Sequence, residues 1–241
     1  MSSIKNLVVN GCSYMEGYAR GNGHIDLASQ LNIPNAISLA IGGSANSRII
    51  RTTLKHSYQT IEPTLYVLGL TFISRSEIPI LKGNNEFEGR WCNPQNQEFS
   101  DQWDYFWSRK LSEEFVRIKL ITEIHSLLDR TEDLMYNLLA AMASLQSRGH
   151  QVVVYQQADT DYHCYLDQLK HFDNKNIIEG FRWCAINYQH VHGVPVAPDG
   201  PVTYIGPTDV PANIRHRAVG QHQLLNQFLI NYIKENNVLT A

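Results

Sequence analysis

The sequence lacks any long hydrophobic run, and this excludes the simplest membrane-protein architecture. No apolar stretch approaches the roughly 20 residues that a helix needs to cross a bilayer. The short apolar segment after Lys5 is also too brief for the hydrophobic region of a secretory signal. We therefore expect a cytoplasmic protein without a membrane partner.

A strong excess of charge of either sign is also lacking. The 241 residues carry a formal net charge of −3, so no overall field favours nucleic acid as a partner. Hydrophobic residues make up 43% of the chain and charged residues 18%, which suits a protein with a sizeable core. We expect one domain over residues 1–241.

Cysteine is scarce and unclustered, which argues against a disulfide framework or a zinc site built from CxxC pairs. The four cysteines are Cys12, Cys92, Cys164 and Cys184. Histidine is more common, and His190 and His192 form an HxH pair that could hold a metal on a strand. No Cys or Asp stands at a helpful spacing beside that pair, so we expect neither a metal nor another cofactor.

Short apolar runs alternate with segments of helical periodicity along most of the chain. We expect strands at 4–9, 35–41, 64–70 and 150–156. We expect helices at 24–31, at 46–60 with Asn46 or Ser44 as its cap, at about 111–148 and at about 218–235. This alternation predicts a three-layer α/β/α fold with a mainly parallel, flavodoxin-like sheet.

In such a sheet the functional site lies at the carboxyl ends of the strands. That rule brings residues 10–17, 42–47 and 69–77 to one rim. An insertion at about 78–110 follows, rich in Asn, Gln, Gly and aromatic residues and without clear periodicity. Either it covers the site, or it is a surface insertion whose tryptophans pack on the body.

The first rim segment presents Cys12 and Ser13 on a glycine turn. Gly11 and Gly17 have the spacing of a phosphate-binding loop, but Tyr18 and Ala19 stand where such a loop needs Lys and Ser or Thr. A nucleophile turn fits better, because a serine there would lie at the rim. Its hydroxyl would need a histidine base and donors aimed at the oxyanion.

Two alternatives remain open for this turn. Cys12 is a rival nucleophile if its thiol pKa is lowered, although a small buried residue is its simpler interpretation. Ser13 could instead be the N-cap of the helix that follows.

The glycine turns resemble three blocks of the SGNH (GDSL-like) hydrolases. Gly11-Cys12-Ser13 resembles the Gly-Asp-Ser block, with Cys replacing Asp. Gly43 falls in the register of the second-block glycine. Gly69-Leu70-Thr71-Phe72 takes the place of the third block, with Thr71 replacing the oxyanion Asn.

The fourth block, Asp-x-x-His before the last helix, is matched by Asn213-Ile214-Arg215-His216. The blocks span the whole chain in family order, and the run from Gly42 to Arg51 is similar to that of the short phage-type members. The resemblance therefore also raises a viral origin as an expectation.

The resemblance implies an ester hydrolase with Ser13 as nucleophile and His216 as base. The N–H groups of Ser13 and Gly43, with Thr71 and Asn46, would form the oxyanion hole. Asn213 stands where the family has its acid and offers no charge, so Asp209 or Asp199 could supply it, or catalysis could be weak or lost.

The implied substrate is a small-molecule ester or an acylated carbohydrate, the latter making the protein a carbohydrate O-deacetylase. The alternative is a non-catalytic ligand-binding or virion-associated protein on the same scaffold. The missing Asp and the missing third-block Asn are the sequence features in favour of that alternative.

Overall fold

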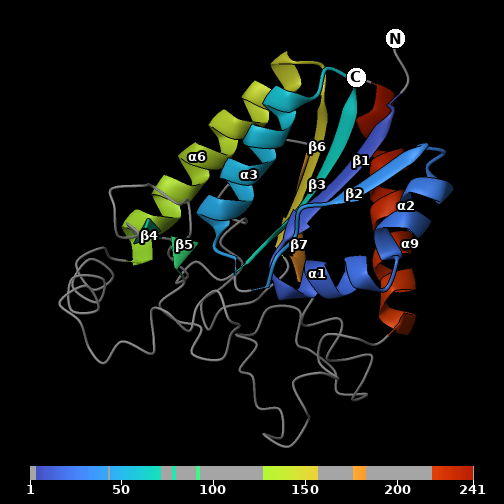
Figure 1. The fold of residues 1–241 in the computed structure, drawn as a ribbon, viewed down its shortest axis with the longest axis horizontal. Coiled ribbons are helices and arrows are strands. Elements are labelled where there is room, and N and C mark those ends of the chain that lie inside the picture. The colour runs from blue at the N-terminus through green and yellow to red at the C-terminus, as the bar shows by residue number, and fades with distance from the viewer. Residues whose placement is uncertain are drawn as a thin grey trace, which may run out of the picture.

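The computed structural model describes residues 4–42, 44–71, 78–79, 91–92, 127–156, 176–182 and 219–240. Its centre is a five-stranded sheet in the order β2-β1-β3-β6-β7, with every pair of neighbours parallel (Figure 1). The strands are β1 Asn6–Gly11, β2 Asn35–Ser38, β3 Thr64–Leu70, β6 Gln151–Gln156 and β7 Ile177–Arg182. This is the strand order of flavodoxin-like sheets, as predicted.

Helices cover both faces of the sheet, so the predicted three-layer arrangement is confirmed. They are α1 Ser13–Arg20, α2 Gly23–Gln30, α3 Asn46–Gln59, α6 Leu127–Ser147 and α9 Val219–Glu235, followed by the 3-10 turn η2 Val238–Thr240. Helices α3 and α6 pack together on one face, while α2 and α9 pack together on the other. Helix α1 lies across the edge at which β1 ends (Figure 1).

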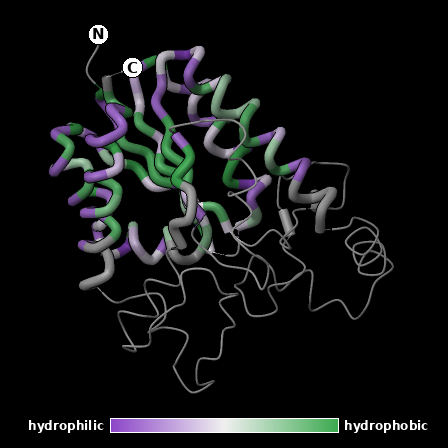
Figure 2. The backbone as a smooth tube through the Cα atoms, turned by 180° about the vertical axis from the view of Figure 1, so that it is seen from behind, coloured by the Kyte–Doolittle hydropathy of each residue, from purple (hydrophilic) through white to green (hydrophobic). Residues whose placement is uncertain are grey.

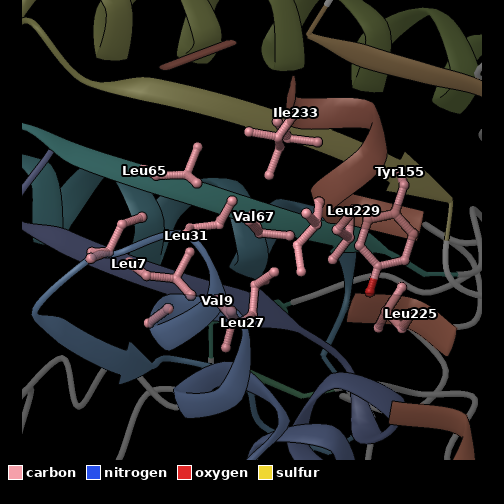
Figure 3. Close-up of a cluster of buried hydrophobic side chains, with 14 of the residues drawn as sticks. Leu7, Val9, Leu27, Leu31, Leu65, Val67, Tyr155, Leu225, Leu229 and Ile233 are labelled. Carbon is pink, nitrogen blue, oxygen red and sulfur yellow. The ribbon is translucent and has the colours of Figure 1, made fainter. Parts of the chain in front are cut away.

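Alternate hydrophobic residues of β1, β3 and β6 enter one of two hydrophobic cores. Leu7 and Val9 face the core beneath α2 and α9, whereas Val8 between them faces the core beneath α3 and α6. Figure 3 shows the first of these cores, with Leu225 and Leu229 of α9 packed toward the sheet. Burial on both faces explains why the central strands form the most continuous hydrophobic region in Figure 2.

All four expected strands are present, and β3 has the predicted bounds. Strand β2 ends at Ser38, three residues before its expected end. Helix α6 begins at Leu127, and the earlier part of the expected helix lies outside the described residues. In the region of the expected insertion, the described residues are two short antiparallel strands, β4 Ile78–Pro79 and β5 Trp91–Cys92.

Two elements and one cap differ from the expectations. Strand β7 was not predicted, and α1 occupies most of the region expected to be a glycine turn. The predicted cap of α3 is wrong, because Ala45 holds the N-cap position and no side chain caps the helix. Ser44 instead donates its hydroxyl to the Ile41 carbonyl, and Asn46 bonds to a neighbouring strand end.

No helix within the described ranges combines the length and the apolar character needed to cross a membrane.

Candidate active site

The ends of β1 and β3 lie side by side and bring two predicted site segments together. Gly11 and Gly69 are register partners in the parallel ladder. Ser13 begins α1 two residues after Gly11, and Thr71 stands two residues after Gly69. The backbones of these two segments therefore share one rim of the sheet, as the carboxyl-end rule predicts.

The third predicted segment joins the same rim. The Leu39 N–H donates to the Val9 carbonyl at 2.9 Å, and the Ile41 N–H donates to the Gly11 carbonyl at 3.3 Å. These bonds continue the β1–β2 pairing beyond the last residue of β2. They bring Gly42 to the rim; Gly43, the predicted oxyanion donor, lies outside the described residues.

Ser13 is the first helical residue after β1. The Glu16 N–H donates to the Cys12 carbonyl at 2.9 Å, which is the first backbone bond of the helix. Cys12 holds the N-cap position in an extended conformation, so the alternative that Ser13 is the cap is wrong. The N–H of Ser13 belongs to the first turn, whose N–H groups have no acceptor within the helix. A group of this kind can stabilise negative charge.

Cys12 is a reduced thiol with none of its surface exposed. This burial agrees with the interpretation of Cys12 as a small core residue rather than a nucleophile.

Asn10, which sequence reasoning overlooked, anchors the end of β1 to α3. Its amide nitrogen lies 3.0 Å from the Ile49 carbonyl, 2.8 Å from Thr52 Oγ1 and 2.9 Å from Thr53 Oγ1. Its Oδ1 accepts the Gly11 N–H at 2.9 Å. A fully buried polar side chain held in this way is a rigid support for the turn that follows. Its only sequence signal is a polar residue at the end of an apolar strand.

Asn46 and Thr71 form a reciprocal pair. The Asn46 amide nitrogen donates to the Thr71 carbonyl at 3.1 Å, and Asn46 Oδ1 accepts the Thr71 N–H at 2.8 Å. Both residues are buried. Because its backbone N–H is engaged by Asn46, Thr71 would reach an oxyanion through its hydroxyl. Asn46 is itself a predicted oxyanion donor, but its contacts here are with the Thr71 backbone. Asn46 therefore positions Thr71, another of the predicted donors.

Glu16 is a second residue that sequence reasoning did not select. Its Oε2 accepts the Gly42 N–H at 2.7 Å, and its Oε1 pairs with Arg20 one turn later on α1. On the other side of the same turn, Arg48 Nη1 donates to Ser44 Oγ at 2.9 Å. The two chain neighbours of Gly43 are therefore held from α1 and from α3.

The fourth block lies outside the described residues. This applies to the predicted base His216, to Asn213, to the alternative acids Asp209 and Asp199, and to the His190–His192 pair. Among the residues that are described, no group of three His, Cys, Asp or Glu side chains is placed to hold a metal ion. The catalytic and oxyanion assignments remain predictions, with Ser13, Thr71 and Asn46 on segments that meet at one rim.

Comparisons with solved structures find ten matching chains. No protein-family model matches the chain, and a search of curated proteins returns no significant match. One similar structure is a psychrotrophic esterase, EstA, from Pseudoalteromonas sp., crystallised with monoethylphosphonate as inhibitor. It is 10% identical, with 96% of this chain and 97% of that chain covered and a TM-score of 0.48. Another is a protein from Desulfitobacterium hafniense DCB-2 that is described as a putative lipolytic protein of the G-D-S-L family. It is 9% identical, with 95% and 99% covered and a TM-score of 0.46.

Proposed function

We propose that this protein is a serine ester hydrolase in which Ser13 is the nucleophile and His216 the general base. The observation that carries the proposal is the position of Ser13 as the first residue of α1, immediately beyond a buried strand. The pairing of Gly11 with Gly69 brings Thr71 to the same rim. A serine at a helix N-terminus beside a second polar strand end suits attack on a carbonyl whose oxygen becomes negative.

The reaction would proceed through an acyl-enzyme. Ser13 Oγ attacks the ester carbonyl carbon while His216 takes the hydroxyl proton, and the tetrahedral oxyanion forms. Collapse breaks the bond to the alkoxy group, which leaves with the proton from His216. Water then attacks the acyl-serine, gives its proton to His216, and the acid departs as Ser13 regains its hydrogen.

The oxyanion would be held by the N–H groups of Ser13 and Gly43 and by the Thr71 hydroxyl. The Asn46–Thr71 pair supports this arrangement, because it prevents the end of β3 from shifting when charge develops. Preorganised donors of this kind do not have to reorient during the reaction, which is the basis of their catalytic effect.

The substrate we propose is a small-molecule ester or an acylated carbohydrate, which would make the protein an O-deacetylase. The aromatic residues of the 78–110 segment would supply flat surfaces for sugar or acyl groups. This assignment rests on the family resemblance, and the alternative is a binding or virion-associated protein with the same scaffold.

A fluorophosphonate probe tests the nucleophile directly, since it labels only an activated serine. We expect one labelled site at Ser13, together with slow hydrolysis of p-nitrophenyl acetate. Ser13→Ala should remove both signals. Ser29→Ala, which changes an exposed serine of α2, should leave both intact and is the matched control.

The two alternatives have their own outcomes in this assay. If hydrolysis survives Ser13→Ala but is lost in Cys12→Ala, then the thiol is the nucleophile. A wild-type protein that is not labelled and does not hydrolyse the ester, but binds an acylated sugar, would support the binding-protein alternative.

The acid can be assigned in the same assay. Loss of the triad carboxylate costs on the order of 10⁴-fold in rate, so an Asn at that position predicts slow turnover. If Asn213 occupies the site, then Asn213→Asp should raise kcat. If Asp209 or Asp199 is the acid, its change to Ala should lower kcat sharply and Asn213→Asp should give no gain.

A further inference from the structure

We propose that Glu16 is a positioning residue, which holds the peptide of Gly42, the chain neighbour of the predicted oxyanion donor, against α1. The inference rests on the proposed function, because it assigns Gly43 as an oxyanion donor. It adds a residue that the family blocks do not include, and it follows from contacts within the described part of the chain.

The carboxylate of Glu16 bridges the two segments that must act together. Glu16 lies one helical turn after Ser13, and its Oε2 accepts the Gly42 N–H at 2.7 Å. Gly42 is the chain neighbour of Gly43. A charge-assisted bond of this length is strong and directional. It therefore couples the position of the helix that begins at the nucleophile to the peptide next to the predicted donor.

Bonds within the segment fix the Ile41 carbonyl, which accepts the Ser44 N–H at 3.3 Å and the Ser44 hydroxyl at 2.6 Å, whereas the Gly42 N–H is held from α1 by Glu16. Gly42 lacks a Cβ atom, so its peptide would otherwise have access to many backbone orientations. Among the described residues, the furthest bond that continues the β1–β2 pairing is the 3.3 Å contact from the Ile41 N–H to the Gly11 carbonyl. An oxyanion donor is effective only when its direction is set before the reaction.

A second set of contacts holds the turn from the opposite side. Arg48 of α3 donates from Nη1 to Ser44 Oγ at 2.9 Å, and the Ser44 hydroxyl donates to the Ile41 carbonyl at 2.6 Å. The same helix carries Asn46, which fixes Thr71. Glu16 thus holds this segment from α1, while α3 holds it through Arg48 and positions the Thr71 donor through Asn46.

The charge of Glu16 makes its pairing with Arg20 significant. A carboxylate close to an oxyanion donor opposes the negative charge that develops on the substrate. The Arg20 guanidinium, bound to Oε1, offsets part of that repulsion, and the N-terminal location of Glu16 on α1 does so as well. The arrangement orients the Gly42 peptide with a smaller electrostatic penalty than a lone carboxylate would impose.

The test compares three variants by kcat, KM and thermal stability on p-nitrophenyl acetate. We expect Glu16→Ala to lower kcat on the order of 10²-fold with little change in KM, as for a misplaced oxyanion donor. Glu16→Gln keeps an oxygen that can accept the Gly42 N–H and should restore most of kcat. Glu62→Ala is the matched control, because Glu62 accepts a side-chain bond from Asn6 at the amino end of β1.

A readout that does not depend on activity completes the experiment. In glycine-selective ¹⁵N spectra, Glu16→Ala should move the Gly42 amide proton upfield, while Glu16→Gln should leave it near its original position. A lower melting temperature for Glu16→Ala with an unchanged kcat would mean that Glu16 only stabilises the fold, and would overturn the proposal. An unshifted Gly42 amide would overturn it as well.

Failure of the proposed function gives a different pattern. A wild type that neither hydrolyses the ester nor reacts with the fluorophosphonate would remove the hydrolase assignment and, with it, this role of Glu16. An active wild type that loses activity in Ser13→Ala but not in Glu16→Ala would overturn only the positioning role. Loss in Glu16→Ala with rescue by Glu16→Gln supports both.

Discussion

The two ends of β1 each carry a buried asparagine, but the two side chains differ in what they hold. At the amino end, Asn6 donates to Glu62 Oε2 at 3.1 Å, and its Oδ1 accepts from Asn35. At the carboxyl end, Asn10 contacts the Ile49 carbonyl, two threonine hydroxyls and the Gly11 N–H. Asn6 therefore joins side chains near the surface, whereas Asn10 fixes backbone that leads into the candidate site.

The same contrast extends across the sheet. At the amino ends of the strands, His56, Tyr66 and His150 pack edge to face, with ring centroids 5.8 and 5.5 Å apart. These rings mainly fill space, and His56 Nδ1 lies 2.9 Å from the Tyr66 hydroxyl. At the carboxyl ends, the polar side chains of Glu16 and Asn46 bond to backbone N–H groups. A site that depends on aimed N–H groups needs the second kind of environment.

Breaking the Asn10 network should have the largest effect on stability. Asn10→Ala removes the acceptor of the buried Gly11 N–H and the amide donor to Ile49, Thr52 and Thr53, so we expect a loss of about 3 kcal/mol in unfolding free energy. The same change should lower kcat, because the turn before Ser13 loosens. Urea denaturation and ester hydrolysis measure the two effects.

The matched variant is Asn6→Ala at the other end of the strand. It should cost about 1 kcal/mol, since the freed groups lie near solvent, and it should leave kcat unchanged. Equal losses of stability in the two variants would contradict the distinction between the ends of β1.

A second pair of asparagines separates stability from catalysis. Asn176 directly precedes β7 and donates to the carbonyl of Val152, near the amino end of β6, at 2.6 Å. It is buried like Asn46. Removing either amide should cost about 2 kcal/mol, because a buried backbone group loses its partner. Only Asn46→Ala should also reduce kcat, through the Thr71 donor.

Denaturation curves and single-turnover rates distinguish these outcomes. A similar drop in kcat for Asn176→Ala would show that activity follows overall stability rather than the geometry of the rim.

The smallest effect we expect is a pH dependence that arises at the amino end. Burial lowers the pKa of His150 below its usual value of 6.5; the Ser57 carbonyl opposes this, while Arg148 and His56 add to it. Burial also lowers the pKa of His56. The unfolded chain therefore binds protons more readily than the folded chain as the pH falls below about 6.5, and stability should decline there.

Replacing His150 with Phe should reduce this decline while it retains the ring contact with Tyr66. Thermal melts between pH 5 and 8 provide the measurement, and kcat per folded molecule should be the same in both proteins at a given pH. An unchanged pH profile in His150→Phe would remove His150 as the cause.

Much of the layered fold could be predicted, because its signals are local. Val8 and Leu65 lie in short apolar runs, and their burial on both faces gives a continuous hydrophobic pattern without reference to any distant residue. The bounds of the helix after Ser13 could not be predicted, because its buried face consists mainly of Met15 and Tyr18, which is too few apolar residues for a clear helical period. Strand β7 was missed because Glu179 and Gly180 interrupt its apolar run.

The candidate site also contains residues that could be predicted from the sequence and residues that could not. The glycine turns and Ser13 were identifiable from spacing and resemblance, since each block is contiguous in the chain. Glu16 and Asn10 were not, because an isolated polar residue does not indicate which partner it will meet. The partners of Glu16 and Asn46 are 26 and 25 residues away, and those of Asn10 in α3 are 39 to 43 residues away.

By itself, then, the sequence determined the alternation of strands and helices and the order in which the glycine turns reach the rim. These properties depend on periodicity and chain connectivity, which act over a few residues at a time. Only the tertiary structure decided that Cys12 rather than Ser13 caps α1, that Asn46 bonds to Thr71, and that Glu16 receives the Gly42 N–H. Those outcomes depend on which backbone groups lack a partner once the sheet has formed, and that is settled by packing across the rim.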